Sequence, residues 1–161
     1  GADSIFLTST AAGALPLFLD LLPAAGVNPG TTQYLGLSRW DVPPQILSMP
    51  GAQGSYFTLS DPGAKNAFES RYRAQFSSEP HQLAGLAFDG INAIASLVRQ
   101  GRADALSGRA LTQSAGFQGA SGVFRIRPDG TNQRGLAVAT VRNNQVTILD
   151  PAPSGFGGAG F

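Results

Sequence analysis

Two short segments of this 161-residue chain carry side chains that could hold a small polar ligand. One segment is a run of hydroxyls, and the other combines a hydroxyl, a guanidinium, an indole and a carboxylate; the residues are Thr8, Ser9 and Thr10, then Ser38, Arg39, Trp40 and Asp41. These groups supply hydrogen-bond donors and acceptors, and the indole supplies a flat apolar wall. The alternative for the second segment is an ordinary loop that is anchored by its tryptophan.

Two further polar residues could take part in chemistry. Asp89 stands in the middle of an apolar segment with helical spacing. Its carboxylate either faces a ligand or a hinge, or it is solvated or paired with an arginine. His81 is the only histidine, and its position directly after Pro80 is typical of an exposed residue in the first turn of a helix.

Catalysis requires acids, bases or nucleophiles within reach of one another, and the sequence offers no such set. With no cysteine and a single histidine, thiolate nucleophiles, disulfides and multi-histidine metal sites are excluded. Residues 155–160 match GxGxxG, but the helix that a dinucleotide site needs does not follow them. We therefore expect a protein that is not an enzyme and uses no metal and no cofactor.

The composition indicates a folding chain with an unusually uncharged surface. Hydrophobic residues make up 42% of the sequence, charged residues 13%, and the net charge is +1. That charge gives no electrostatic basis for binding nucleic acid. The longest apolar run, residues 11–25, contains two prolines and an aspartate and is too short to span a bilayer.

A parallel α/β unit would position the two polar segments. Residues 4–8 and 33–37 are short apolar runs typical of buried parallel strands, and a helix is expected between them at about 14–25. A third strand is expected at 54–59. Because ligands of open α/β sheets bind outside the carboxyl ends of the strands, both polar segments would lie at the ligand-binding edge.

The remainder reads as a helical middle followed by antiparallel strands. Helices are predicted at 62–76, 81–99 and 107–111, and Phe68, Tyr72 and Phe76 form a stripe that is typical of a core. From Gly122 the hydrophobic period changes to two. We expect one antiparallel meander with a Pro-Asp-Gly turn and an Asn-Asn turn, its strands at 122–127, 135–142 and 145–149.

In this order the features resemble the second half of type I periplasmic binding proteins, the leucine/isoleucine/valine-receptor group. The resemblance spans nearly the whole chain and rests on Ser4–Leu7, Leu15–Ala25, Tyr34-Leu35-Gly36, Gly54-Ser55-Tyr56-Phe57, Phe68…Tyr72…Phe76…Pro80, Ala87-Phe88-Asp89 and Phe117…Gly119…Gly122…Phe124…Asp129-Gly130. It implies an α/β chain that forms half of a two-lobed fold.

The resemblance also implies how the chain divides between the lobes. Residues 1–58 and 120–150 would form the second-lobe sheet, and residues 59–119 would be a helical segment of the first lobe. The composition of residues 151–161, rich in Gly and Pro, predicts a flexible tail. Leu59 and Gly119 would then lie at crossings between the lobes and act as hinges.

The finer resemblance is to penicillin-binding protein activators, lipoproteins that share the receptor fold. Asp150-Pro151-Ala152-Pro153…Phe156 and Arg39-Trp40-Asp41 resemble that branch. Amino-acid receptors hold the ligand's ammonium with an acidic residue just after the second strand, where this chain has Ser38, and Asp41 is a poor substitute. Receptors also tend to place an aromatic after the first strand, where this chain has Ser9, Thr10 and Ala11.

The activator resemblance implies a periplasmic module that regulates peptidoglycan synthesis through contact with a peptidoglycan synthase. The parent protein would be a lipid-anchored outer-membrane protein. The alternative is a receptor for a small polar solute that serves an ABC uptake transporter. Without the first lobe, we expect the apolar faces of helices 62–76 and 81–99 to pack on each other or on a second copy of the chain.

Overall fold

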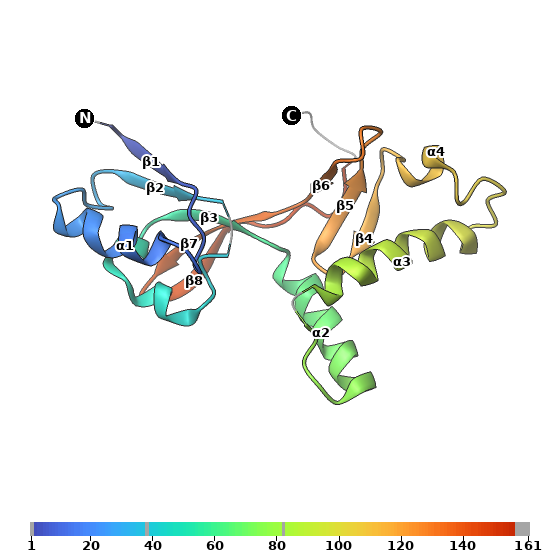
Figure 1. The fold of residues 1–161 in the computed structure, drawn as a ribbon, viewed down its shortest axis with the longest axis horizontal. Helices are drawn as coiled ribbons and strands as arrows, with labels where there is room; N and C mark the ends of the chain where they lie inside the picture. Colours follow the sequence, from blue (N-terminus) through green and yellow to red (C-terminus); the bar gives the residue numbers. More distant parts are fainter. Residues whose placement is uncertain (1, 38, 82, 157–161) are drawn as a thin grey trace. The chain divides into compact units, whose positions relative to one another are not determined.

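The computed structural model describes residues 2–37, 39–81 and 83–156. Its elements are, in chain order, β1 (Ser4–Leu7), α1 (Leu15–Ala24), β2 (Gln33–Gly36), the 3-10 helices η1 (Pro44–Ser48) and η2 (Pro50–Ala52), β3 (Tyr56–Leu59), α2 (Pro62–Phe76), α3 (Ala84–Arg99), α4 (Gly108–Leu111), β4 (Phe117–Gly119), β5 (Gly122–Ile126), β6 (Asn132–Arg134), β7 (Ala137–Arg142) and β8 (Gln145–Asp150) (Figure 1). No helix among these is long and apolar enough to cross a membrane.

The chain folds into two compact units. Unit 1 takes its residues from Gly1–Leu59 and Ala137–Pro151, and unit 2 from Ser60–Leu136 and Ala152–Phe161. The chain therefore passes between the units after Leu59, after Leu136 and after Pro151.

Unit 1 is built on a five-stranded sheet with the order β1-β2-β3-β7-β8. The pairs β1–β2 and β2–β3 are parallel, whereas β7 runs antiparallel to β3 and β8 antiparallel to β7. Helix α1 connects the parallel strands β1 and β2, as such a pair requires. The predicted parallel start and mixed α/β class are confirmed.

The core of unit 1 lies between α1 and the sheet. Leu15 and Leu19 of α1 are fully buried against a cluster that includes Tyr34, Phe57 and Val141. Pro16 is tolerated in the first turn of α1, where its missing N–H has no acceptor within the helix. The strand β1 departs from the prediction of a strand buried on both faces. It is an edge strand, and Phe6 is 56% exposed.

The bounds of α2 match the prediction, and α3 and α4 end where predicted, but α3 begins at Ala84 and not at residue 81. Asp61 caps α2, because its Oδ1 accepts hydrogen bonds from the N–H groups of Gly63 and Ala64 at 2.8 and 3.0 Å. Gly101 follows α3 with φ +69°, and the Ser107 hydroxyl caps α4. These local signals set the helix boundaries.

The antiparallel strands differ from the single predicted meander because they divide between two sheets. In unit 2, β4, β5 and β6 form a three-stranded antiparallel sheet, while β7 and β8 belong to unit 1. Both predicted turns are present: Gly130 has φ +83°, and Asn143 and Asn144 have φ +51° and +62°. The divided pairing arises because β6 adds a strand to β5 before the chain continues into β7.

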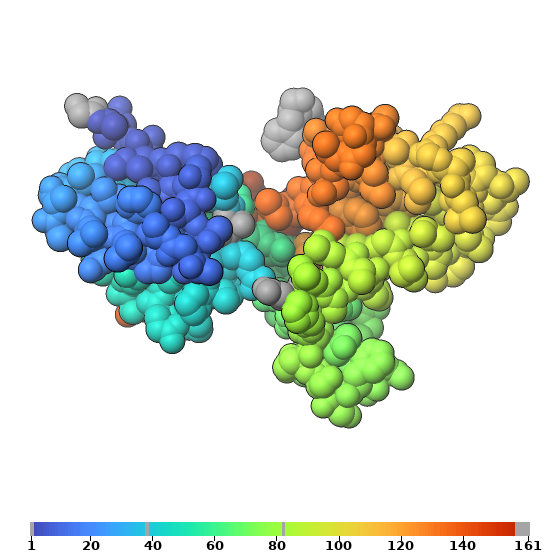
Figure 2. Space-filling model, viewed as in Figure 1, coloured from blue at the N-terminus to red at the C-terminus, as the bar shows by residue number. Residues whose placement is uncertain are grey.

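The aromatic stripe of α2 is not a core, which corrects the prediction. No residue of α2 is buried, and Phe76 is 60% exposed. The two long helices touch through Phe68 and Phe88, whose ring centroids lie 5.2 Å apart. The outer face of α3, however, remains exposed through its large apolar side chains Leu86, Ile91, Ile94 and Val98, together with Leu83 directly before the helix. Figure 2 shows this helix, in yellow-green, at the surface of the viewed side of unit 2.

Candidate functional site

The carboxyl ends of β1 and β2 bring the two predicted polar segments to one edge of the unit 1 sheet. Leu7, the last residue of β1, pairs in parallel with Gly36, the last residue of β2. Residues 8–10 and 39–41 therefore leave the sheet at the same edge, as expected for a ligand site in a parallel sheet. Ser38 lies outside the described residues.

The hydroxyl run forms the turn that leads into α1. The carbonyl oxygen of Thr10 accepts hydrogen bonds from the N–H groups of Gly13 and Leu15 at 2.9 and 3.3 Å. Thr8 and Thr10 are exposed, and Ser9 is half-buried. Their hydroxyls are available to a ligand at this edge.

Trp40 is a core residue and not part of an open ligand wall. Its side chain is 1% exposed and stacks on Phe57, with ring centroids 6.0 Å apart and an interplanar angle of 9°. It also lies so close to Gly36 that a Cβ at that position would be 2.3 Å from its Cε2. The glycine at the end of β2 therefore makes room for the indole.

The residues on either side of Trp40 have different environments. Arg39 is exposed, adopts φ +58°, and donates its N–H to the carbonyl oxygen of Thr58 at 3.3 Å. Asp41 is half-buried, and its Oδ1 is buried without a hydrogen-bond partner among the residues that the structure describes. A buried acceptor without a partner costs about 1–3 kcal/mol. Among the described residues, Oδ1 of Asp41 thus lacks a donor at this edge, and the indole N–H of Trp40 likewise lacks an acceptor.

The two predicted hinge residues occupy different places. Leu59 is the last residue of unit 1 before the first passage of the chain. Gly119 lies inside unit 2, in β4, and the second passage follows Leu136. A Cβ on Gly119 would lie 2.5 Å from Oδ1 of Asp89, so the close approach of this carboxylate explains the glycine there.

Asp89 is buried in unit 2, where the arginine-paired alternative applies. Its Oδ2 accepts from Nη1 of Arg134 at 2.7 Å, and its Oδ1 accepts from the backbone N–H of Ala120 at 2.6 Å. Arg134 also lies 5.0 Å from the centre of the Phe124 ring. This partner is not apparent from the sequence, because Arg134 is far from Asp89 along the chain.

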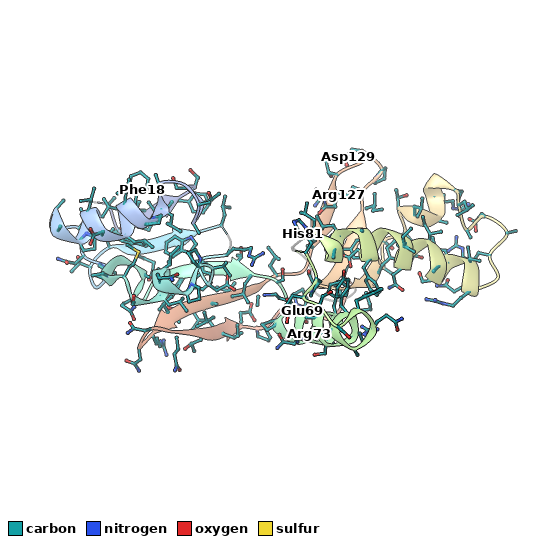
Figure 3. The ribbon with its side chains drawn as sticks, turned by 60° about the horizontal axis from the view of Figure 1, so that its bottom comes forward. Phe18, Glu69, Arg73, His81, Arg127 and Asp129 are labelled. Atoms are coloured by element: carbon teal, nitrogen blue, oxygen red, sulfur yellow. The ribbon has the colours of Figure 1, made fainter. Side chains whose placement is uncertain are left out.

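The remaining charged residues of unit 2 form surface contacts. Arg102 beside Asp104 holds the pKa of that carboxyl below its ordinary value, and it does so first through a side-chain hydrogen bond. The hydroxyl and N–H of Thr131 similarly lower the pKa of Asp129 at the tip of the β5–β6 turn, which Figure 3 labels. His81 is exposed, and its Nδ1 accepts from the N–H of Leu83.

A shallow pocket in unit 2 lies between α2 and α3, and the sequence did not predict it. Its lining is almost entirely aromatic, with one guanidinium: Phe68, Arg71, Tyr72, Phe76 and Phe88. The contribution of Phe88 follows from the packing of the two helices, which the spacing within α2 alone does not reveal. Within the described residues, no three histidine, aspartate or glutamate side chains gather as they would around a metal ion.

Comparison with known proteins gives the same fold. A structure described as a branched-chain amino acid ABC transporter from Rhodospirillum rubrum superposes with a TM-score of 0.71 at 19% identity, over 91% of this chain and 44% of that one. A leucine-binding protein from Thermotoga maritima gives 0.57 at 19%, over 93% and 44%. A solute-binding protein from R. palustris in complex with benzoate gives 0.55 at 17%, over 94% and 44%. The chain thus spans less than half the length of these structures.

No curated protein matches the sequence significantly. The sequence pattern of one family, described as periplasmic binding protein, matches residues 1–145. That match takes in both parallel and antiparallel strands of unit 1 and almost all of unit 2. The chain therefore belongs to the periplasmic binding protein family.

Proposed function

We propose that the chain is a non-catalytic part of a two-lobed extracytoplasmic protein. Unit 1 would be the sheet of the second lobe, and the helices of unit 2 would belong to the first lobe. Both the family match and the length of the superposed structures support this assignment. The apolar outer face of α3 would then pack on a sheet that the rest of the first lobe supplies.

Within this fold, the activity that we propose is that of a penicillin-binding protein activator. The module would regulate peptidoglycan synthesis in the periplasm by binding a peptidoglycan synthase, and its parent would be lipid-anchored in the outer membrane. The observation that carries this proposal is the outward face of α1. Leu15 and Leu19 bury the inner face, yet Leu17, Phe18 and Leu21 are 62%, 41% and 58% exposed.

This outward face is a surface suited to a protein partner. Asp20 is the only charged residue of α1, and Phe18 lies on the side of α1 turned away from the sheet (Figure 3). A helix that packs one face in a core usually carries polar residues on the other. Apolar side chains gathered on an exposed helix face mark interaction sites.

The test is a binding measurement between the purified parent protein and the periplasmic domain of a peptidoglycan synthase. Replacing Leu17 and Leu21 by serine should weaken binding at least about tenfold, since anchor residues of an interface contribute 1 kcal/mol or more each. The matched control is Ile148→Ser, an exposed apolar residue on β8 of the same unit. Unchanged binding by the α1 variant, or no binding by the wild type, would refute the proposal.

A second candidate is a receptor for a small polar solute, and the unpartnered Oδ1 of Asp41 favours it. A ligand that donates a hydrogen bond there would lie at the same edge of the sheet as the hydroxyls of residues 8–10. Thermal-shift measurements on the parent protein with amino acids, short peptides and muropeptides test this candidate. A ligand at about 100 times its Kd adds about 2.7 kcal/mol of stability. A shift with one solute that Asp41→Ala abolishes would establish the receptor and displace the activator.

A further inference from the structure

All three segments that enter or leave unit 2 are fixed to the same piece of structure. That piece is the β4–β5 hairpin, residues 117–126, and we name it the anchor hairpin. The first segment enters unit 2 after Leu59. Directly afterwards, the N–H of Asp61 donates to the carbonyl oxygen of Ser121 at 3.2 Å. A Cβ on Gly122 would lie 3.0 Å from Cβ of Asp61, so the two backbones are in close contact.

The second segment leaves unit 2 after Leu136 and is held just before that point. The N–H of Gly135 donates to the carbonyl oxygen of Val123 at 2.9 Å. Its neighbour Arg134 lies over the ring of Phe124 and pairs with Asp89.

The third segment re-enters unit 2 after Pro151 and packs along the anchor hairpin. The side-chain amide of Gln118 donates to the carbonyl oxygen of Ser154 at 2.9 Å, and the guanidinium of Arg125 lies 4.7 Å from the centre of the Phe156 ring. A Cβ on Gly135 would lie 2.8 Å from Cγ of Pro153, so the second and third segments also touch each other. Residues 152–156 are therefore docked, although the sequence predicts a flexible tail there.

Asp89 fastens the anchor hairpin to α3. Its carboxylate takes the N–H of Ala120, at the end of β4, and the guanidinium of Arg134, next to the second segment. One turn further along α3, the Asn92 side chain donates to the carbonyl oxygen of Gln118 at 3.1 Å. One buried carboxylate thus holds the hairpin and a connecting segment at once.

We propose that Asp89 is a positioning residue. By holding the anchor hairpin against α3, it gives the three connections between the units one rigid point of attachment. Bending between the units is then confined to the connecting residues that are not fixed to the anchor hairpin, namely Leu59–Ser60, Leu136 and Pro151–Ala152. The conformation of these short segments sets the range of movement. Loss of the contacts of Asp89 would release the anchor hairpin and so lengthen all three flexible segments together.

The test measures the distribution of distances between the units. Because the chain contains no cysteine, Asp20→Cys on α1 and Arg99→Cys on α3 provide two unique spin-label sites for pulsed dipolar spectroscopy. We expect Asp89→Asn to broaden the distribution about twofold, since loss of a local anchor releases a cooperative segment. The second variant, Arg134→Gln, should broaden it as well, and it keeps the bond between Asp89 and Ala120.

The matched control is Phe88→Ala. It truncates the neighbouring residue of α3, which contacts Phe68 of α2, so it loosens unit 2 away from the anchor hairpin. The control should lower the unfolding temperature and leave the width of the distribution unchanged. An unchanged width in both Asp89→Asn and Arg134→Gln, or equal broadening in Phe88→Ala, would overturn the proposal. Since Arg134 is partly exposed, its substitution retains a test if Asp89→Asn does not fold.

Discussion

Gly36 has to be a glycine because of a contact with Trp40, only four positions further along the chain. The indole fills the volume that a side chain at residue 36 would occupy, and it stacks on Phe57 from the neighbouring strand. The same tryptophan, read from the sequence alone, is equally compatible with a ligand wall. Its burial depends on the pairing of β2 with β3.

Gly36→Ala should destabilise unit 1 by about 2 kcal/mol or more, because the new Cβ would overlap buried indole atoms that cannot move aside freely. The expected result is a fall of several degrees in the thermal unfolding temperature followed by circular dichroism. The matched control is Gly30→Ala, since no atom lies within 4 Å of a Cβ there. Equal effects of the two substitutions would contradict the packing described for Trp40.

Asp129, at the β5–β6 turn, is expected to contribute to folding stability in a way that depends on pH. Its pKa is lowered because Thr131 donates two hydrogen bonds to the ionised carboxylate. A depressed folded-state pKa contributes stability that is present above the ordinary aspartate value and is lost as the pH falls through the lowered value. Carbon-detected NMR titration should show Thr131→Val moving the Asp129 pKa upward. No movement would rule out the hydroxyl as its partner.

At the scale of elements, the boundaries follow from local chemistry and the pairings do not. The cap at Asp61, the Asn143–Asn144 turn and the glycine after α3 are local signals, and each could be read from the sequence. The assignment of β7 to β3 rather than to β5 depends on contacts between distant residues. The same reason hides the Asp89–Arg134 pair and leaves the 3-10 helices unpredicted.

At the candidate site, too, some features follow from the local sequence and others depend on contacts between distant residues. The parallel order of β1 and β2 predicts which loops meet at the edge, and the structure places residues 8–10 and 39–41 there. The sequence does not reveal which of these side chains turns inward, because the burial of Trp40 depends on its stacking on Phe57 of β3.

Removing the cap of α2 tests the local signal directly. Asp61→Ala should cost about 1 kcal/mol, because two N–H groups at the start of α2 lose their acceptor. Asp61→Asn should cost less, since the amide oxygen can replace the carboxylate in the same geometry. Equilibrium urea unfolding of both variants gives the comparison. A loss as large for asparagine as for alanine would contradict the capping role.

At the scale of the whole molecule, exposed apolar surface is the feature that composition alone conceals. The outer faces of α1 and α3 expose large aliphatic or aromatic side chains, namely Leu17, Phe18, Leu21, Leu86, Ile91, Ile94 and Val98, and Leu83 directly before α3 is exposed as well. Exposed apolar surfaces of this kind are usually buried against another protein surface.

The 161-residue chain by itself should therefore self-associate as its concentration rises. Sedimentation velocity should show a growing larger species, because association removes the apolar face of α3 from water. Ile91→Asp with Val98→Asp should shift the equilibrium to the monomer, whereas Asn66→Asp, an exposed charge change on α2, should not. A wild-type chain that stays monomeric at all concentrations would contradict this prediction.

The strand order of unit 1 has a consequence for the chain as it emerges from the ribosome or a translocation pore. β3 needs β7 as its second neighbour, but all the residues of α2, α3 and the anchor hairpin are delivered between these two strands. During that interval the growing chain presents β3 as an open edge, which is the kind of edge that pairs with other chains. Pairing of Ala137–Arg142 with β3 closes this edge. Synthesis that is halted before this point would therefore leave a partly folded chain that is prone to aggregate.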